Sequence, residues 1–172
     1  MLKPQDILVL LKVHISPSNW TYNELAQSLN MSSSEVHAAL KRCHTCHLYH
    51  RSQQRIIKPA LEEFLIHGLK YVFPSQPGAL VRGLPTAHSA PPLNSLLSVN
   101  PQDIYVWSFP NGDVKGQEIQ PLYRSVPHAV QQDPNLYELL SLVDSLRVGK
   151  IREQQLAAIE LNKRLYASSS NR

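Results

Sequence analysis

The segment TYNELAQSLNMSSSEVHAALKRCHT covers residues 21–45, and its pattern decides how the first part of the chain folds. Thr21 precedes Glu24 by three residues, and Ser32 precedes Glu35 by the same spacing. In such a capping box, each side chain satisfies an exposed backbone N–H group of the other residue, which starts a helix. The segment therefore predicts two helices, one beginning after Thr21 and the other after Ser32.

The turn between these helices begins at Asn30, because asparagine tolerates the left-handed conformation that ends helices. Both helices carry apolar residues at helical spacing, namely Leu25, Ala26 and Leu29 in the first and Val36, Leu40 and Cys43 in the second. An apolar helix that starts at Pro4 precedes them, with Ile7, Leu10 and Leu11 at helical spacing. Three helices with a short turn between the last two indicate a helix-turn-helix, which places its last helix in a DNA groove.

Two short β-prone pieces follow, Leu48-Tyr49 and residues 55–57, and they flank a polar, basic tip at residues 51–54. This pattern predicts a β-hairpin, the wing of a winged helix. Pro59 is suited to start a fourth helix, whose apolar stripe is Leu61, Phe64, Leu65, Leu69 and Val72. We therefore predict a winged helix-turn-helix DNA-binding domain over residues 1–73.

The composition changes after this domain, since residues 74–134 contain ten of the 13 prolines. We expect residues 74–133 to form a proline-rich extension in which residues 84–93 are extended. Residues 104–107 and 116–119 flank Asn111-Gly112, a dipeptide suited to a tight hairpin turn. The extension is therefore predicted to contain a β-hairpin.

The C-terminal residues 134–167 are predicted to form a pair of helices, with a break at Gly149. In the second helix, Ile151, Ala158 and Leu165 recur every seven residues, a seam that either packs on its own chain or dimerises. Residues 168–172 read as a frayed tail. The fold class is therefore mainly α with small β: a winged helix-turn-helix domain, a β-hairpin in a proline-rich extension, and a C-terminal helical pair.

The positive charges of the chain are concentrated near the second capped helix. The net charge of the 172 residues is +4, but residues 41–58 contain five Lys or Arg and no acidic residue. A local basic stripe on a nearly neutral protein indicates one anionic contact surface. We expect the helix face with Ser34, His37 and Lys41 to read bases in a major groove, beside Ser33. The residues expected to hold phosphates are Arg42, Arg51, Arg55 and Lys58.

The two cysteines form the pattern Cys43-His44-Thr45-Cys46-His47. The attachment of c-type haem uses this spacing, but that chemistry needs an exported chain. Cys43, Cys46 and His47 are also candidate metal or redox ligands, although a structural zinc site usually takes a second ligand pair from a distant segment. Cys43 is expected to point inward with Leu40 as a small core residue. No metal and no cofactor is therefore predicted.

An enzyme is not predicted, because the sequence contains none of the glycine-rich phosphate loops, nucleophile elbows or paired metal-binding histidines that identify common catalytic sites. The longest apolar run, Ile7 to Leu11, is far shorter than the ~20 residues that span a bilayer. No signal peptide is recognised at the start of the chain. We expect a cytoplasmic, nucleoid-associated protein without a membrane partner.

Several stretches of the chain resemble bacterial winged-helix transcriptional regulators of the MarR-like type, within a largely uncharacterised family. The first group of stretches is residues 2–12 (LKPQDILVLLK), 21–26 (TYNELA) and 31–37 (MSSSEVH). The second group is residues 63–68 (EFLIHG), 71–74 (YVFP), 82–87 (RGLPTA), 90–93 (APPL) and 136–140 (LYELL). The resemblance extends to about Leu165. It departs from the family pattern at residues 43–47, where alanine, arginine and glycine are more usual.

The resemblance implies a regulator whose gene lies beside one for a toxin-like nucleotidyltransferase, and hence an antitoxin or autorepressor role with that protein as a partner. Together, the residues and the resemblance predict a sequence-specific regulator that binds double-stranded DNA as a homodimer. Two alternatives stay open. One is a protein-interaction adaptor that uses the winged helix as a scaffold and residues 82–93 as a docking segment. The other is a thiol- or metal-responsive regulator that uses Cys43 and Cys46.

Overall fold

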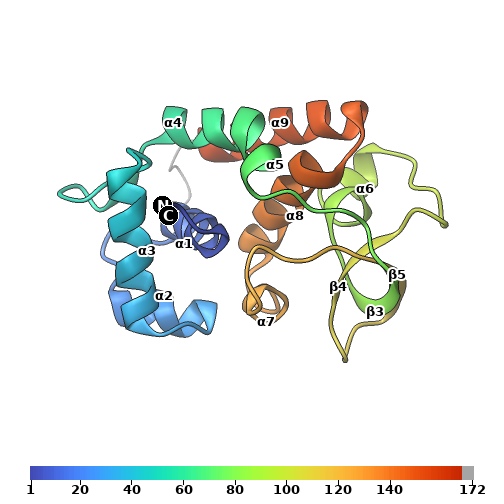
Figure 1. Ribbon diagram of the computed structural model, residues 1–172, viewed down its shortest axis with the longest axis horizontal. Helices are drawn as coiled ribbons and strands as arrows, with labels where there is room; N and C mark the ends of the chain where they lie inside the picture. Colours follow the sequence, from blue (N-terminus) through green and yellow to red (C-terminus); the bar gives the residue numbers. More distant parts are fainter. Residues whose placement is uncertain (168–172) are drawn as a thin grey trace.

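The computed structural model describes residues 1–167, which are mainly α-helical with a small amount of β-structure (Figure 1). The first half contains α1 (Pro4–Ile15), α2 (Tyr22–Leu29), α3 (Ser33–Thr45), β1 (Tyr49–His50), β2 (Arg55–Ile56), α4 (Lys58–Glu63) and α5 (Leu69–Val72). The second half contains β3 (Leu80–Pro85), α6 (Leu93–Leu96), β4 (Tyr105–Ser108), β5 (Val114–Glu118), α7 (Val126–Ala129), α8 (Pro134–Val148) and α9 (Ile151–Leu165). The predicted tail at residues 168–172 lies outside the described residues.

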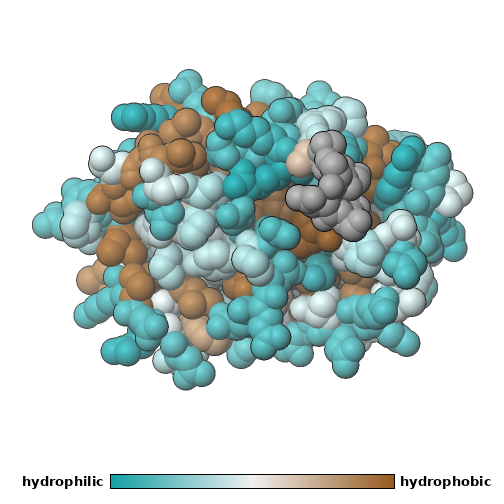
Figure 2. Space-filling model, turned by 180° about the vertical axis from the view of Figure 1, so that it is seen from behind, coloured by the Kyte–Doolittle hydropathy of each residue, from teal (hydrophilic) through white to brown (hydrophobic). Residues whose placement is uncertain are grey.

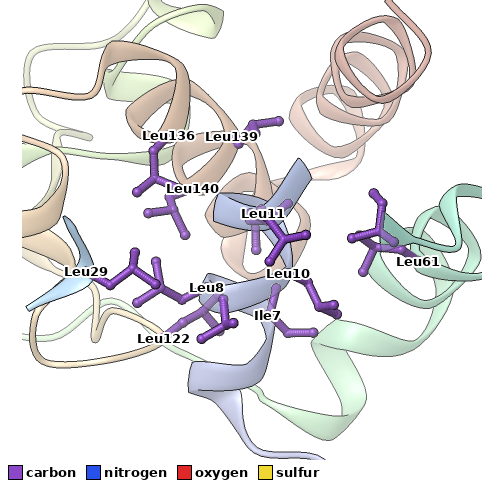
Figure 3. Close-up of a cluster of buried hydrophobic side chains, with 14 of the residues drawn as sticks. Ile7, Leu8, Leu10, Leu11, Leu29, Leu61, Leu122, Leu136, Leu139 and Leu140 are labelled. Atoms are coloured by element: carbon purple, nitrogen blue, oxygen red, sulfur yellow. The ribbon is translucent and has the colours of Figure 1, made fainter. Parts of the chain in front are cut away.

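Helix α1 is the centre of the molecule. All five residues of its apolar run, Ile7 to Leu11, are completely buried, so the helix is covered on every side. A helix that is apolar all round needs this surrounding. Residues of α2, α3, β2 and α8 pack against it, and Figure 3 shows leucines from later segments of the chain, including Leu29, Leu61 and Leu140, converging on α1. One core therefore runs through all three predicted segments.

The helices and the hairpin predicted for residues 1–73 are present. In the hairpin, β1 and β2 pair antiparallel, with Tyr49 opposite Ile56. The fourth helix extends from α4 to α5 but contains a π-helical turn at Phe64–Gly68. A π-helical turn inserts an extra residue and shifts the apolar stripe around the axis. Leu61, Leu65 and Leu69 are buried as predicted, whereas Val72 at the end of the stripe is exposed.

The strands of the second half form a closed three-stranded barrel. Strand β3 pairs antiparallel with both of the others: Leu84 lies opposite Trp107 of β4, and Arg82 lies opposite Lys115 of β5. Because β4 and β5 both run against β3, they run parallel to each other, and Tyr105 pairs with Gln117. Figure 1 places this barrel at the end of the molecule farthest from α3.

The predicted hairpin at Asn111-Gly112 is wrong, although both of its strands exist. A tight hairpin turn of this type needs positive φ angles, and neither residue has one. Instead, Gly112 lies against the backbone of Gly83, where an added Cβ atom would come within 2.3 Å of the carbonyl oxygen. The glycine is therefore required for close contact with β3. From the Asn-Gly dipeptide alone, this requirement looks the same as that of a tight turn.

Residues 82–93, the docking segment of the adaptor hypothesis, are built into the fold. Their first part belongs to β3, which has partners on both sides. Thr86, Ala87, Ala90 and Leu93 in the second part are buried. The segment is therefore packed into the barrel end of the molecule, and it is not an exposed extended segment on which a partner could dock.

The C-terminal helical pair is present, and its seam packs within the chain. Ala157, Leu161 and Leu165 of α9 are completely buried, and α9 contacts α4, α6 and α8. Ile151, which the heptad spacing placed in the same seam, is instead 75% exposed. Of the two alternatives for the apolar seam, the structure shows packing on its own chain.

A buried polar cluster holds the barrel on α8. The carboxylate of Asp144 accepts hydrogen bonds from Thr86 Oγ1 at 2.8 Å, from Trp107 Nε1 at 2.7 Å and from Arg147 Nη1 at 2.9 Å. Arg147 also donates to the carbonyl oxygen of Phe73. Burial raises the pKa of Asp144, and its three hydrogen-bond donors oppose that rise. The cluster ties the barrel, α8 and the end of α5 to one residue.

None of the helices in residues 1–167 has the length and apolar character required to cross a membrane. The face seen from behind is largely hydrophilic (Figure 2). Hydrophobic areas gather on the left of this view, which corresponds to the right of Figure 1, where the barrel and α6 lie. Hydrophilic residues predominate on the opposite side, toward α3 and the β1–β2 hairpin.

Candidate nucleic-acid interface

Both predicted capping boxes are present, one at the start of α2 and the other at the start of α3. The Thr21 N–H donates to Glu24 Oε2 and the Ser32 N–H to Glu35 Oε2, each at 2.8 Å. The return bonds, from the N–H groups of Glu24 and Glu35 to the two hydroxyls, are 3.2 Å long. Asn30 has a left-handed backbone with φ of 52°, as predicted for the end of α2. The turn between α2 and α3 is therefore bounded by the left-handed Asn30 at the end of α2 and by the Ser32 capping box at the start of α3.

Helix α3 presents the predicted polar face to solvent. Ser34, His37 and Lys41 are exposed, whereas the opposite residues Val36, Leu40 and Cys43 are buried. The His37 ring stacks on Tyr22 of α2, with 3.5 Å between ring centroids and 10° between the planes. This stack restricts the orientation of the imidazole on the outer face of α3.

The hairpin after α3 carries two exposed arginines. Arg51 begins the tip and Arg55 follows it in β2. The tip is tied back to the region before α2, because Trp20 Nε1 donates to the carbonyl oxygen of Gln54 at 3.4 Å. Gln54 itself has a left-handed backbone with φ of 49°, which closes the turn. The hairpin is therefore attached to the residues before α2 and, through β1, to α3.

A cavity of about 270 Å³ lies between the outer face of α3 and the hairpin. The charged and aromatic residues that line it are Tyr22, His37, Lys41, His44, Tyr49 and Arg51. Lys41 from the helix and Arg51 from the hairpin thus meet at one hollow, together with two imidazole rings. These cationic and ring-bearing side chains are suited to a ligand that combines negative charge with planar groups. The phosphates and bases of a nucleic acid meet this description.

Several of the predicted contact residues have partners within the chain or lie on another side of the hairpin. Arg42 is turned toward α1, where its Nε and Nη2 atoms donate to the buried carboxylate of Asp6 at 2.8 and 2.7 Å. We correct its predicted role from holding phosphate to neutralising Asp6. The Ser33 hydroxyl donates to Asn23 Oδ1. Lys58 lies 5.8 Å from the Tyr166 ring and shares a second hollow with Arg55 on another side of the hairpin.

The cysteine segment does not form one cluster. Cys43 is completely buried, and its thiol donates to the backbone oxygen of Asp6 at 3.8 Å. Burial, followed by the charge of Asp6, raises the pKa of this thiol. Cys46 is exposed at the end of α3, and His47 follows it with a left-handed backbone. Within residues 1–167, no three His, Cys, Asp or Glu side chains come together as a set that could hold a metal ion.

Among the contributors to this region that the sequence did not identify are His44 and Tyr123. His44 lines the cavity and its Nδ1 atom contacts the carbonyl oxygen of Tyr49 at 3.2 Å. Its spacing of two helical turns from His37 is a signal that could have identified it. The second is Tyr123, whose hydroxyl donates to Glu35 Oε1 at 2.8 Å. The Ser32 N–H and then this hydroxyl lower the pKa of Glu35. No local pattern connects residues so far apart in the chain.

The chain was also compared with known proteins. No family model, no curated protein and no solved structure matches it. The interface is therefore interpreted from its own chemistry.

Tyr49 at the base of the cavity provides a pH-dependent prediction. The residue is 2% exposed, its hydroxyl has no hydrogen-bond partner among the described residues, and burial raises its pKa to about 12. The folded protein therefore disfavours the ionised phenol. The resulting contribution to stability is complete below the unfolded pKa near ~10 and is lost as pH rises through about 12.

We expect Tyr49→Phe to reduce the alkaline decline in the free energy of unfolding between about pH 9 and 12. At neutral pH the variant should be about 1 kcal/mol more stable, because it removes a buried hydroxyl that lacks a partner. Urea unfolding followed by circular dichroism at several pH values measures both effects. Superimposable pH curves for the variant and the wild type would contradict this account of Tyr49.

Proposed function

We propose that the protein is a sequence-specific transcriptional regulator that binds double-stranded DNA through a winged helix-turn-helix of the MarR-like type. The observation that carries this proposal is the convergence of Lys41 from α3 and Arg51 from the hairpin on one hollow, beside the exposed His37. A helix and a hairpin that present cations on one surface match a recognition helix and its wing.

In the proposed complex, α3 lies in the major groove. Ser34, His37 and Lys41 then point at base edges, where a hydroxyl, an imidazole and an ammonium group distinguish base pairs by hydrogen bonding. Arg51 on the hairpin neutralises a phosphate beside the hollow, and Arg55 and Lys58 contact phosphates from the other side of the hairpin, where they share the second hollow. Phosphate contacts of this kind fix the register of the protein on the duplex but carry no sequence information.

We further propose that two copies bind together as a repressor or autoregulator. Two α3 helices in successive major grooves require a palindromic operator with half-sites about one helical turn apart. The seam of α9 is occupied within the chain by α4, α6 and α8, so the dimer contact has to use another surface. In the proposed dimer this other surface lies away from α3, so the outer face of α3 in each copy is free to contact DNA.

The test is a selection of genomic DNA fragments by the purified protein at about physiological salt, read by sequencing. We expect a palindrome to be enriched, and its half-site spacing to match about 10–10.5 base pairs. A variant that lacks positive charge on a distant surface, Lys115→Ala with Lys163→Ala, should recover the same sequence. Salt-sensitive binding without sequence enrichment would refute the regulator and leave a nonspecific anion-binding surface.

A further inference from the structure

A second candidate site lies at the end of the molecule away from α3, around His88. This residue follows β3 in a short 3-10 helical turn (Ala87–Ser89) and is 5% exposed. Its ring packs edge-on against Tyr105, with 4.7 Å between centroids. Its Nε2 atom is hydrogen-bonded to the carbonyl oxygen of Asp103. Because a carbonyl oxygen only accepts, Nε2 carries the proton, and in the neutral ring Nδ1 is left as an acceptor.

This Nδ1 atom has no hydrogen-bond partner among the described residues, although it is buried. The nearest charged group is the carboxylate of Glu153, whose Oε1 atom lies 3.8 Å away. In this tautomer two acceptors, His88 Nδ1 and Glu153 Oε1, face each other across the gap, while the other oxygen of Glu153 accepts from the backbone N–H of Lys150 at 2.6 Å. The preceding residue, Ala87, has a φ of 54°, a conformation that alanine rarely adopts, so the backbone holds the ring in place at some cost.

The gap opens into a cavity of about 310 Å³. Its lining has three parts: the two acceptors on His88 and Glu153, the two cations Lys150 and Arg152, and an apolar wall of Leu96, Leu97 and Val99. This volume is at the lower end of the range for small-molecule sites, which begins at about 300 Å³. A metal ion does not fit this set, because two neighbouring cations oppose it and His88 and Glu153 provide only two ligands.

We propose that this cavity binds a free amino acid with an apolar side chain. Its ammonium group donates to both His88 Nδ1 and Glu153 Oε1, since one nitrogen at about 2.9 Å from each acceptor bridges a gap of 3.8 Å. Its carboxylate pairs with Lys150 and Arg152 in charge-assisted hydrogen bonds. Its side chain lies on the apolar wall. The assignment does not depend on the proposed DNA binding.

Calorimetric titration of the full chain with L-leucine tests the assignment. Two analogues separate the parts of the ligand: 4-methylpentanoate lacks the ammonium group and 3-methylbutylamine lacks the carboxylate. We expect leucine to bind and each analogue to bind at least about tenfold more weakly, because each loses a charge-assisted interaction. Absence of leucine binding, or equal binding of either analogue, would overturn the proposal.

A pair of variants on α9 places the ligand in the cavity. Arg152→Gln should weaken leucine binding by about tenfold, whereas Lys163→Gln, with the same charge change at an exposed position near the other end of α9, should leave it unchanged. Both side chains are exposed, so both variants should keep the circular dichroism spectrum of the wild type. Equal leucine affinity in the two variants would show that leucine binds elsewhere and would refute the site. DNA binding measured on Arg152→Gln reports separately on the proposed regulator.

Discussion

Simultaneous replacement of Lys41 and Arg51 by alanine is expected to weaken binding to the selected operator by about tenfold to a hundredfold at ~0.15 M salt. The two side chains line the same hollow between α3 and the hairpin, and each is exposed. Removing both eliminates two cationic contacts with the duplex. The slope of log affinity against log salt concentration should therefore decrease by about two.

The matched control is Lys115→Ala with Lys163→Ala, which removes the same charge from β5 and α9, outside the interface. Fluorescence anisotropy titrations of a labelled operator at several salt concentrations give both the affinity and the slope. We expect the control to retain the wild-type slope within about half a unit. Equal losses in the two double variants would mean that net charge, and not the α3 surface, governs binding.

Asp144→Ala is expected to lower the free energy of unfolding by about 3–5 kcal/mol. The substitution leaves the Arg147 guanidinium, whose side chain is 5% exposed, without its carboxylate partner. It also removes the acceptor for Trp107 Nε1 and Thr86 Oγ1. Breaking a buried ion pair from one side is costly because the remaining charge stays buried and uncompensated.

Urea unfolding followed by far-ultraviolet circular dichroism measures this loss. Asp113→Ala changes the same type of side chain at an exposed position and should alter the free energy by no more than about 0.5 kcal/mol. Asp144→Asn retains oxygen and shape, so we expect an intermediate loss. If Asp144→Ala costs less than about 1 kcal/mol, the cluster does not hold the barrel on α8.

The sequence predicted elements that rest on short-range chemistry. Both capping boxes and the left-handed Asn30 involve residues no more than three positions apart, and the structure reproduces each of them. The first hairpin is present for the same reason, since a short polar tip joins its strands. The outward orientation of Ser34, His37 and Lys41 follows from the helical period alone.

The errors occur where distant residues decide the structure. Gly112 lies against the backbone of Gly83 in β3, and the strands on either side of it pair in parallel with each other instead of forming an antiparallel hairpin. Arg42 lies on a helix with exposed cations, yet a buried carboxylate on α1 takes its guanidinium. Nothing within a few residues of Gly112 or Arg42 carries this information. The sequence therefore predicted the polar face of α3 and left undetermined which of its cations are available.

The position of α1 has a consequence for the synthesis of the protein. Helix α1 ends at Ile15, but α8, which covers one of its sides, begins only at Pro134. At about 5–20 residues per second, the apolar run of α1 waits on the order of ten seconds on the ribosome before this partner emerges. During that interval α2, α3 and β2 have already been made, but the side of α1 that α8 covers stays exposed. That side of α1 is thus an apolar surface that chaperones can shield until α8 is made.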